Sequence, residues 1–389
     1  MFLKSALIRH YKSLDNALIE FSNPITVLVG PNAVGKSNVI DCLRFVRDAV
    51  TTDLEHAVST RGGIGRVRQY SKTKPYKLSV KLEFVQDFAV APTRPASYEF
   101  AIESQTASNY TVDSERSSYF APTGSDETPI QQDFVRDRSG RVYSGGSEAS
   151  YRVSQDQLAL GQLRGLHRQS AWSLERFIRD WRYAEIYPNR LREPSSPDKD
   201  KVLSEDGRNW ASVIKTLRRT PRGRDSLDRV FEAMKIVIPS FQEVAVSTVG
   251  NYLVPRFRFA MGAKDKVEFD PVQLSDGTLR IFGILLALYQ LPAPELLVIE
   301  EPEQAVHPGV LGVLADAFRE ASERTQIIVT THSPHFVDHF EPEQVLVVTL
   351  EDGHTRVSKV KSTQLEAVKR RLMSMQDFML AEGLLPEEA

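Results

Sequence analysis

The chain has 389 residues, 41% of them hydrophobic and 26% charged, a composition typical of a soluble globular protein of one large or two fused domains. A formal net charge of −2 argues against polyanion binding by the whole surface and restricts any nucleic-acid contact to a local basic patch. The single cysteine, Cys42, excludes internal disulfides and cysteine-based zinc sites, and it is predicted to be a buried thiol. No secretory pattern and no membrane-length apolar run is present, so we expect a cytoplasmic protein.

The first 23 residues alternate between apolar and polar positions, which predicts strands at 2–8 and 17–21 around a turn at 12–15. An apolar, β-branched run at 25–29 predicts a buried strand. It leads into G-P-N-A-V-G-K-S-N at 30–38, and a helical apolar pattern continues from Val39. The pattern G-x-x-x-x-G-K-S between a strand and a helix is the P-loop, so the sequence predicts a nucleotide-binding site here.

The residue types of the P-loop suit the binding of a nucleotide and its metal ion. Gly30 and Gly35 allow backbone dihedrals that turn successive amides toward phosphate oxygens. Lys36 supplies a positive charge for the β- and γ-phosphates, and Ser37 offers a hydroxyl to Mg²⁺. The helix that begins there points the positive end of its dipole at the same anion. With ATP and Mg²⁺ as cofactors, the predicted nucleotide-binding residues of this loop are Gly30, Asn32, Gly35, Lys36, Ser37 and Asn38.

Residues 61–77 form a basic stretch with interleaved glycines and tyrosines and no acidic residue. Such a stretch can contact a nucleic-acid backbone, and it can equally be a solvated hairpin with basic faces. Residues 78–150 then alternate in short segments, most clearly at 78–84 and 98–102, which predicts a β-rich arm. The basic residues of the stretch are Arg61, Arg66, Arg68, Lys72, Lys74 and Lys77.

Residues 151–240 are predicted to be a helical insertion, because the apolar period becomes helical from residue 154. Asp206 or Asn209 is placed to cap one of its helices, and another amphipathic helix is predicted at 227–238. No sustained heptads are present, which excludes a long coiled coil. The insertion also carries a second basic cluster, typical of a solvated face, formed by Lys215, Arg218, Arg219, Arg222 and Arg224.

Three motifs follow the insertion. After predicted strands at 241–249 and 254–259, L-S-D-G-T at 274–278 opens an apolar helical run. L-L-V-I-E-E-P at 296–302 is a buried strand that ends in Glu300 and Glu301, and I-I-V-T-T-H-S-P at 327–334 is a strand that delivers His332. The remaining chain predicts a hairpin at 344–350 and 356–361 and a terminal amphipathic helix.

The order P-loop, L-S-x-G-x, strand-E-E and strand-T-H-S resembles the head of ABC-type ATPases. The residues of these motifs are similar to those of the SMC/RecF/OLD branch, above all to its short stand-alone members described as AAA-family ATPases. The resemblance spans nearly the whole chain and is strongest at 25–45 and 270–335. It implies an α/β fold, an ABC-type P-loop NTPase head with an antiparallel β arm and a helical insertion in place of coiled-coil arms. The expected division is a P-loop lobe with the arm at 1–150, the insertion at 151–240, a catalytic lobe at 241–350 and a C-terminal hairpin end and helix at 351–389.

The resemblance also implies roles for the later motifs. Ser275 and Gly277 would face the γ-phosphate of a nucleotide on another head, with Asp276 in place of the more usual glycine or lysine. The L-S-D-G-T motif at 274–278 is called the signature below. Since the chain has one P-loop and one signature, the implied assembly is a homodimer that holds ATP between P-loop and signature in trans. Glu301 would be the general base, and His332 the switch histidine at the γ-phosphate. The implied metal ligands are Ser37, Glu300 and Gln162.

Further assignments rest on the same resemblance. Lys12, in I-R-H-Y-K-S at 8–13, would lie near the nucleotide, and it can equally be an exposed turn lysine. Gln162, with Gln157 as second choice, would be the Q-loop glutamine that reaches Mg²⁺. Glu303 and the His307–Pro308 pair lie where the D-loop would cross the dimer interface.

The implied function is that of an ATP-hydrolysing SMC/RecF-like ATPase that dimerises on ATP. We expect it to act with DNA in repair or phage defence, gating a separate effector such as a nuclease. The 57 residues after His332 are too few for the TOPRIM domain of OLD nucleases, so cleavage would need such a partner. The alternative is a nucleotide-dependent switch that binds a protein partner without nucleic acid. A transporter ATPase fits less well, because the residues around the signature and Glu300 do not resemble those of transporter ATPases.

Overall fold

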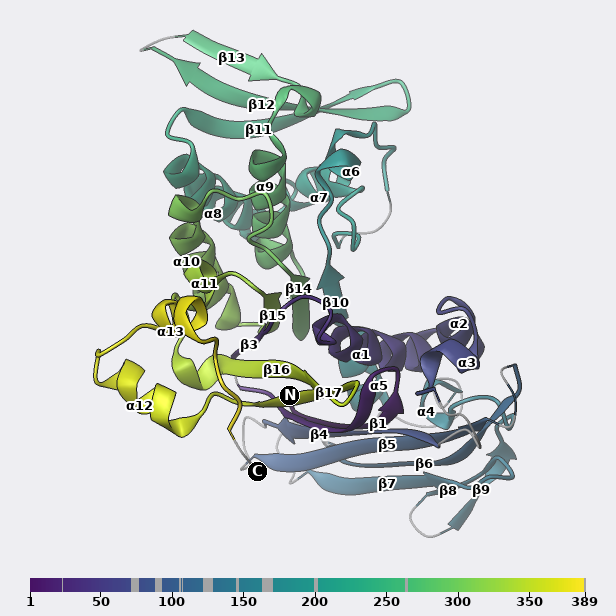
Figure 1. The fold of residues 1–389 in the computed structure, drawn as a ribbon. Coiled ribbons are helices and arrows are strands. Elements are labelled where there is room, and N and C mark those ends of the chain that lie inside the picture. Colours follow the sequence, from purple (N-terminus) through teal and green to yellow (C-terminus); the bar gives the residue numbers. More distant parts are fainter. Residues whose placement is uncertain are drawn as a thin grey trace.

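The chain folds around a six-stranded sheet with the strand order β10-β14-β15-β3-β16-β17 (Figure 1). The first five strands are parallel, and β17 pairs antiparallel with β16 at one edge. Every residue of β3 and β15 is buried, as expected for a parallel sheet covered on both faces. The strands are β3 Ile25–Val29, β10 Trp181–Ala184, β14 Leu296–Glu300, β15 Gln326–Thr331, β16 Val345–Glu351 and β17 His354–Lys359. This computed structural model describes residues 1–22, 24–70, 77–87, 93–104, 106, 108–121, 129–144, 147–162, 171–198, 202–262 and 265–387.

A second, antiparallel sheet of eight strands has the order β2-β1-β4-β5-β6-β7-β8-β9 and confirms the predicted β arm. The alternation at 78–84 becomes β4, along which buried and partly exposed residues alternate strictly, because one face packs on the core. The strands are β1 Phe2–Tyr11, β2 Leu14–Glu20, β4 Leu78–Gln86, β5 Arg94–Ser104, β6 Tyr110–Ala121, β7 Ile130–Arg136, β8 Arg141–Ser144 and β9 Ser147–Arg152.

Helix α1 (Lys36–Thr51) lies between these two sheets (Figure 1). Its apolar residues share one core with the eight-stranded sheet, with α5 and with one face of the central sheet. Cys42 belongs to this core and is fully buried, which confirms the predicted structural thiol. The short helices on this side are α2 Leu54–Ser59, α3 Ile64–Val67, α4 Ala159–Gln162 and α5 Ala171–Arg179.

The other face of the central sheet packs against helices α7 to α11 in a second core, which also includes part of a three-stranded sheet. The predicted strands at 241–249 and 254–259 belong to this sheet. Its strands are β11 Phe241–Val249, β12 Tyr252–Met261 and β13 Asp265–Phe269. The helices are α6 Pro188–Arg192, α7 Trp210–Leu217, α8 Pro221–Val237, α9 Asp276–Tyr289, α10 Leu311–Ser322 and α11 Pro334–Val337, with 3₁₀ turns at Pro271–Gln273, Pro308–Val310 and Pro342–Gln344.

The described part of the segment 151–240 contains helices α4 to α8, and it also contains β10, a strand of the central sheet. Four residues that are nearly all buried carry no period that separates a strand from a helix, so the sequence pattern could not reveal it. The predicted domain boundaries themselves stay a prediction. Asn209 occupies the N-cap position of α7, but its side chain accepts a hydrogen bond from the Ser204 amide instead of capping the helix.

The C-terminal hairpin is present as β16 and β17, and the terminal helix is divided in two. Helices α12 (Ser362–Lys369) and α13 (Met375–Ala381) are separated because Ser374 caps α13 and accepts a hydrogen bond from the Asp377 amide. No helix within the described ranges combines the length and apolar character needed to cross a membrane.

Candidate functional site

Four neighbouring parallel strands bring the candidate residues to one edge of the central sheet. The P-loop follows β3, His332 follows β15, Glu300 ends β14, and Glu185 follows β10. Ligands of open α/β sheets bind beyond these carboxyl ends. The structure therefore brings together the P-loop, the glutamate pair and the histidine that the sequence singled out.

The two P-loop glycines are required by close packing. Gly35 has a φ of 104°, and a Cβ there would lie 2.0 Å from Thr355 Oγ1. A Cβ on Gly30 would lie 2.3 Å from the Val348 carbonyl of β16. The dihedral reason given for glycine thus applies to Gly35, whereas Gly30 serves close approach to the neighbouring strand.

A hydroxyl and a carboxylate meet between α1 and β14. Ser37 Oγ donates to Glu300 Oε2 at 3.0 Å, and Arg44 Nη2 lies 3.9 Å from Glu300 Oε1. Burial raises the pKa of Glu300, Ser37 and Arg44 oppose the shift, and Glu185 and Glu301 add to it. These are oxygen donors of the kind that Mg²⁺ takes beside a nucleotide, so the pair fits the implied metal.

Lys36 is buried, and its ammonium donates to the carbonyls of Gly30 at 2.7 Å and Pro31 at 2.8 Å. Burial lowers the pKa of Lys36, and the glutamates at 301, 303 and 300 oppose this shift. The charge is therefore held inside the loop, beside the carboxylates of the strand end. Asn32 lies on the exposed part of the same loop.

Glu301 and Glu303 flank His332. Glu301 has a φ of 46°, a left-handed conformation that is uncommon outside glycine and often found at functional sites. His332 Nδ1 lies 3.4 Å from Glu301 Oε1 and 3.6 Å from Glu303 Oε1. Glu303 is 9% exposed and also accepts hydrogen bonds from Thr331 Oγ1 and the His332 amide. The Glu303 carboxylate therefore turns inward onto β15, whereas His307 and Pro308 are exposed. The expectation that this segment crosses a dimer interface stays a prediction.

The signature stands at the start of α9. Ser275 is exposed and caps the helix, since its Oγ accepts from the Thr278 amide at 3.2 Å. A Cβ on Gly277 would lie 2.4 Å from the Ala305 carbonyl, so the first turn of α9 packs on the chain just after the glutamate pair.

Arg280 links the signature helix to the strand ends, and the sequence reading missed it. Its buried guanidinium donates to the Ile186 carbonyl at 2.8 Å and to the Glu301 carbonyl at 2.9 Å. Burial lowers the pKa of Arg280, and Glu303 and Glu301 oppose the shift. Arg280 therefore ties α9 to the backbone just after β10 and β14.

Lys12 and Asn38 both brace the P-loop. Lys12 Nζ pairs with Asp41 Oδ2 at 2.5 Å, and Asn38 Nδ2 donates to Ser13 Oγ at 2.6 Å. These contacts join the turn between β1 and β2 to α1. A nucleotide contact by either side chain stays a prediction.

A chain of hydroxyls continues from Asn38 to the P-loop backbone. Ser13 Oγ lies 2.6 Å from Thr355 Oγ1, which donates to the Val34 carbonyl at 2.8 Å. Thr355 is fully buried and comes from β17, 321 residues further along the chain than Val34. No local signal marks such a residue, because its importance arises from tertiary contact alone.

Gln162 is not near the metal ligands. A Cβ on Gly161 would lie 2.5 Å from the Val50 carbonyl, so α4 packs against the last turn of α1. Ser37 lies in the first turn of that helix, about 20 Å away at 1.5 Å per residue. Gln162 Nε2 donates to Gln157, the second choice, at 3.2 Å. The prediction that Gln162 reaches Mg²⁺ is wrong in this structure, and the strand end beside Glu300 carries Glu185 instead.

Some residues of the first basic stretch form ion pairs within the fold. Arg61 is nearly buried and pairs with Asp41 at 2.9 Å and Asp48 at 3.2 Å on α1, so it is withdrawn from any phosphate contact. The predicted hairpin begins instead with α3. Lys77 pairs with Asp113 at 3.1 Å, and Lys72 and Lys74 lie outside the described residues.

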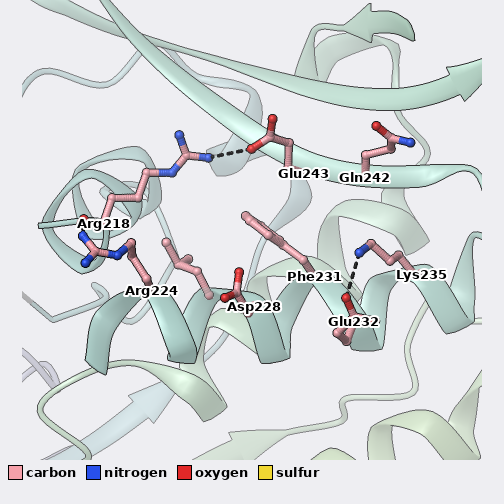
Figure 2. Close-up of a pocket in the computed structure, with 9 residues that line it drawn as sticks. Arg218, Arg224, Asp228, Phe231, Glu232, Lys235, Gln242 and Glu243 are labelled. Carbon is pink, nitrogen blue, oxygen red and sulfur yellow. Dashed lines mark hydrogen bonds and ion pairs between the residues drawn. The ribbon is translucent and has the colours of Figure 1, made fainter. Parts of the chain in front are cut away.

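Part of the second basic cluster lines a groove between α8 and β11 (Figure 2). There Arg218 pairs with Glu243 at 3.3 Å, and the neighbouring Lys235 pairs with Glu232 at 2.7 Å. Acidic residues thus neutralise part of its charge in place, which agrees with a solvated face.

Short segments of curated relatives match this chain. The chromosome partition protein Smc of Halothermothrix orenii is 47% identical over 47 residues, RecF of Thermosynechococcus vestitus, a DNA replication and repair protein, 41% over 46, and the DNA repair protein RAD50 of Saccharomyces cerevisiae 40% over 57. These segments cover 12–15% of this chain and only 4–12% of the relatives' own lengths.

Solved structures match over nearly the full length. An SMC head bound to the C-terminal winged-helix domain of ScpA has a TM-score of 0.58 at 13% identity and covers 95% of this chain and all of the other. An SMC head with an extended coiled coil, bound to the C-terminal domain of ScpA from Pyrococcus furiosus, has a TM-score of 0.50 at 14% identity, with coverage of 95% and 99%. The fold is therefore that of an ABC-type SMC head, as the sequence implied.

A family model described as "AAA domain, putative AbiEii toxin, Type IV TA system" matches residues 25–338. That range runs from the strand before the P-loop to α11 beyond His332. The chain belongs to this family of P-loop ATPases, within the SMC/RecF-like group.

Proposed function

We propose that this protein hydrolyses ATP and dimerises on it, with each nucleotide held between the P-loop of one protomer and the signature of the other. The observation that carries the proposal is the contact of Ser37 with Glu300. It joins the P-loop helix to the strand whose next residue, Glu301, lies within reach of His332. These contacts support a site in which groups for the phosphates, the metal and the general base lie along one sheet edge.

The chemistry assigns one task to each group. The P-loop amides and Lys36 hold the phosphates, and Ser37 and Glu300 would hold Mg²⁺, which supplies charge neutralisation on the phosphoryl oxygens. Glu301 orients the attacking water and accepts its proton. His332, between two carboxylates, is held with Nδ1 toward Glu301 and senses the γ-phosphate.

Support for the arrangement in trans comes from the exposure of the signature. Ser275 lies at an open helix N-terminus, which is an anion-binding device of the same kind as the P-loop. The described contacts of its hydroxyl run to Thr278 in the first turn of α9, so its exposed side is available to a second molecule.

The test is a variant that binds ATP but loses the base. Glu301→Gln should slow turnover by roughly 10²–10⁴-fold and trap the closed dimer, because hydrolysis no longer opens it. Light scattering with Mg²⁺-ATP should show a stable dimer in this variant and a monomer without nucleotide. A monomer at saturating ATP would overturn the proposal of a site shared in trans.

We further propose that the dimer acts with DNA in repair or phage defence and gates a separate effector such as a nuclease. The names of the RecF and RAD50 relatives support repair, and the toxin system in the family description supports defence. Binding to a DNA duplex should fall with salt at a slope of about −0.9 per contacted phosphate. We expect the first basic stretch to make these phosphate contacts. The salt dependence should therefore become weaker when four of its residues are changed to Gln: Arg66, Arg68, Lys72 and Lys74.

The matched control removes four charges from the second basic cluster. In this control the residues changed to Gln are Lys215, Arg219, Arg222 and Arg224. If both sets of changes reduced DNA affinity equally, the affinity would come from the overall positive charge of the surface and not from one contact site. The second candidate function is a switch that binds only protein, favoured by the pairing of Arg61 with Asp41 and Asp48 and by the net charge of −2. An absence of DNA binding in every nucleotide state would favour this candidate over the first.

A further inference from the structure

The signature of this chain carries an acid at a site proposed to receive an anion. Asp276 is the first residue of α9, directly after Ser275, and its side chain is 61% exposed. A carboxylate stabilises a helix N-terminus by its interaction with the helix dipole. The γ-phosphate of a partner's ATP would approach the same helix end, so the two anions would repel each other.

Arg192, the last residue of α6, contacts the chain on both sides of Ser275. Its Nη2 lies 2.6 Å from Asp276 Oδ1 and donates to the Leu274 carbonyl at 2.8 Å. Its Nη1 donates to Asn189 Oδ1 at 3.0 Å, which orients the guanidinium from its own helix. At 21% exposure, its side chain is the better enclosed partner of the ion pair.

We propose that Arg192 is a positioning residue of the signature, which neutralises Asp276 and fixes the turn at Ser275 for a phosphate supplied in trans. The inference rests on the proposed function, since it needs ATP at the signature. An exposed ion pair contributes little to the stability of the free protomer. Closure of a dimer would remove water from the pair, and an unpaired Asp276 would then oppose the phosphate at low dielectric.

Two other roles make different predictions. If Arg192 served only to brace the fold, its loss would lower the melting temperature whether or not Asp276 kept its charge. If Arg192 itself held the phosphate, removal of the Asp276 charge would not compensate for its loss. Neutralisation alone predicts that one charge removal rescues the other.

The experiment measures ATP-driven dimerisation in the Glu301→Gln background by sedimentation, with nucleotide affinity of the dilute monomer measured separately. Arg192→Gln should weaken dimerisation roughly 10- to 100-fold and leave monomer affinity and melting temperature unchanged. Asp276→Asn should dimerise at least as tightly as the parent, and Arg192→Gln/Asp276→Asn should regain most of the loss. The matched control is Arg190→Gln, on the same helix, whose side chain pairs with Glu193 at 2.9 Å.

The proposal is overturned if Arg192→Gln dimerises like the parent, if the double variant stays as weak as Arg192→Gln, or if the melting temperature falls and Asp276→Asn does not restore it. A parent that stays monomeric with ATP contradicts the proposed function itself, and the inference with it. The two failures are therefore distinguishable, because one shows in the parent and the other only in the variants.

Discussion

The P-loop end and the signature end of this chain are built in opposite ways. The P-loop is enclosed, with Lys36 and Thr355 buried and with strands β16 and β17 in close contact with its glycines. The signature stands at the exposed start of α9, where Ser275 and Asp276 face solvent and Arg192 approaches from the side. In the proposed dimer, one half of the nucleotide site is completed within the chain, whereas the other half is left open for a second surface.

Lys36→Ala should break the enclosed half with the largest effect. The variant should lose measurable ATP binding, because the change removes the charge proposed to hold the β- and γ-phosphates. Calorimetric titration with ATP measures the loss, and circular dichroism checks that the fold is intact. An unchanged ATP affinity would contradict the assignment of the P-loop as the nucleotide site.

Thr355→Val should weaken ATP binding about tenfold. The variant keeps the side-chain shape but leaves the Val34 carbonyl without its hydroxyl donor, and an unsatisfied buried acceptor costs about 1–3 kcal/mol. Thr355→Ser retains the hydroxyl and should bind ATP nearly as well as the parent. Thr349→Val, which removes a hydroxyl bonded to Glu351 on the same hairpin, serves as control. Equal losses in the Thr349 and Thr355 variants would show that the hairpin as a whole is at issue.

The pH dependence of Mg²⁺ use should sharpen the comparison at the edge of the enclosed half. The pKa of Glu300 is raised by burial, so on acidification its carboxylate protonates at a higher pH than an exposed glutamate. Because Mg²⁺ needs the charged form, its affinity should fall on acidification by up to about tenfold per pH unit below that pKa. Glu185→Gln removes one of the charges that raise the pKa, and should move the profile of Mg²⁺-dependent turnover to lower pH. Superimposable profiles would exclude this coupling.

Gln162→Ala should have the smallest effect, with turnover within about twofold of the parent. Its side chain lies at the far end of α1, where it contacts Gln157. A large loss of turnover in steady-state assays would mean that this segment approaches the nucleotide in the closed state.

The sequence predicted those parts of the molecule that local pattern determines. The P-loop, the strand that ends in Glu300 and Glu301, and the strand before His332 each combine a buried run with a chemical group at its end, so both fold and position could be read. The strict alternation of 78–84 likewise identified β4.

Other parts depend on contacts between segments distant in sequence. β10 has only four residues, so neither it nor Glu185 at its end could be recognised. Thr355 reaches the P-loop only because β17 pairs at the edge of the central sheet. Gln162 was misplaced because a glutamine at a helix start is common, and its packing on α1 is a tertiary fact. Arg61 looked available for phosphate because its partners, Asp41 and Asp48, lie 13–20 residues earlier.

The hydroxyl donated by Thr355 has a consequence for synthesis of the protein. Val34 leaves the ribosome 321 residues before its partner. At 5–20 residues per second, roughly 16 to 64 s pass between the two. Throughout that interval the nascent chain carries a P-loop whose Val34 carbonyl lacks its donor. The P-loop backbone therefore acquires this hydrogen bond only after translation has reached β17, the edge strand of the central sheet.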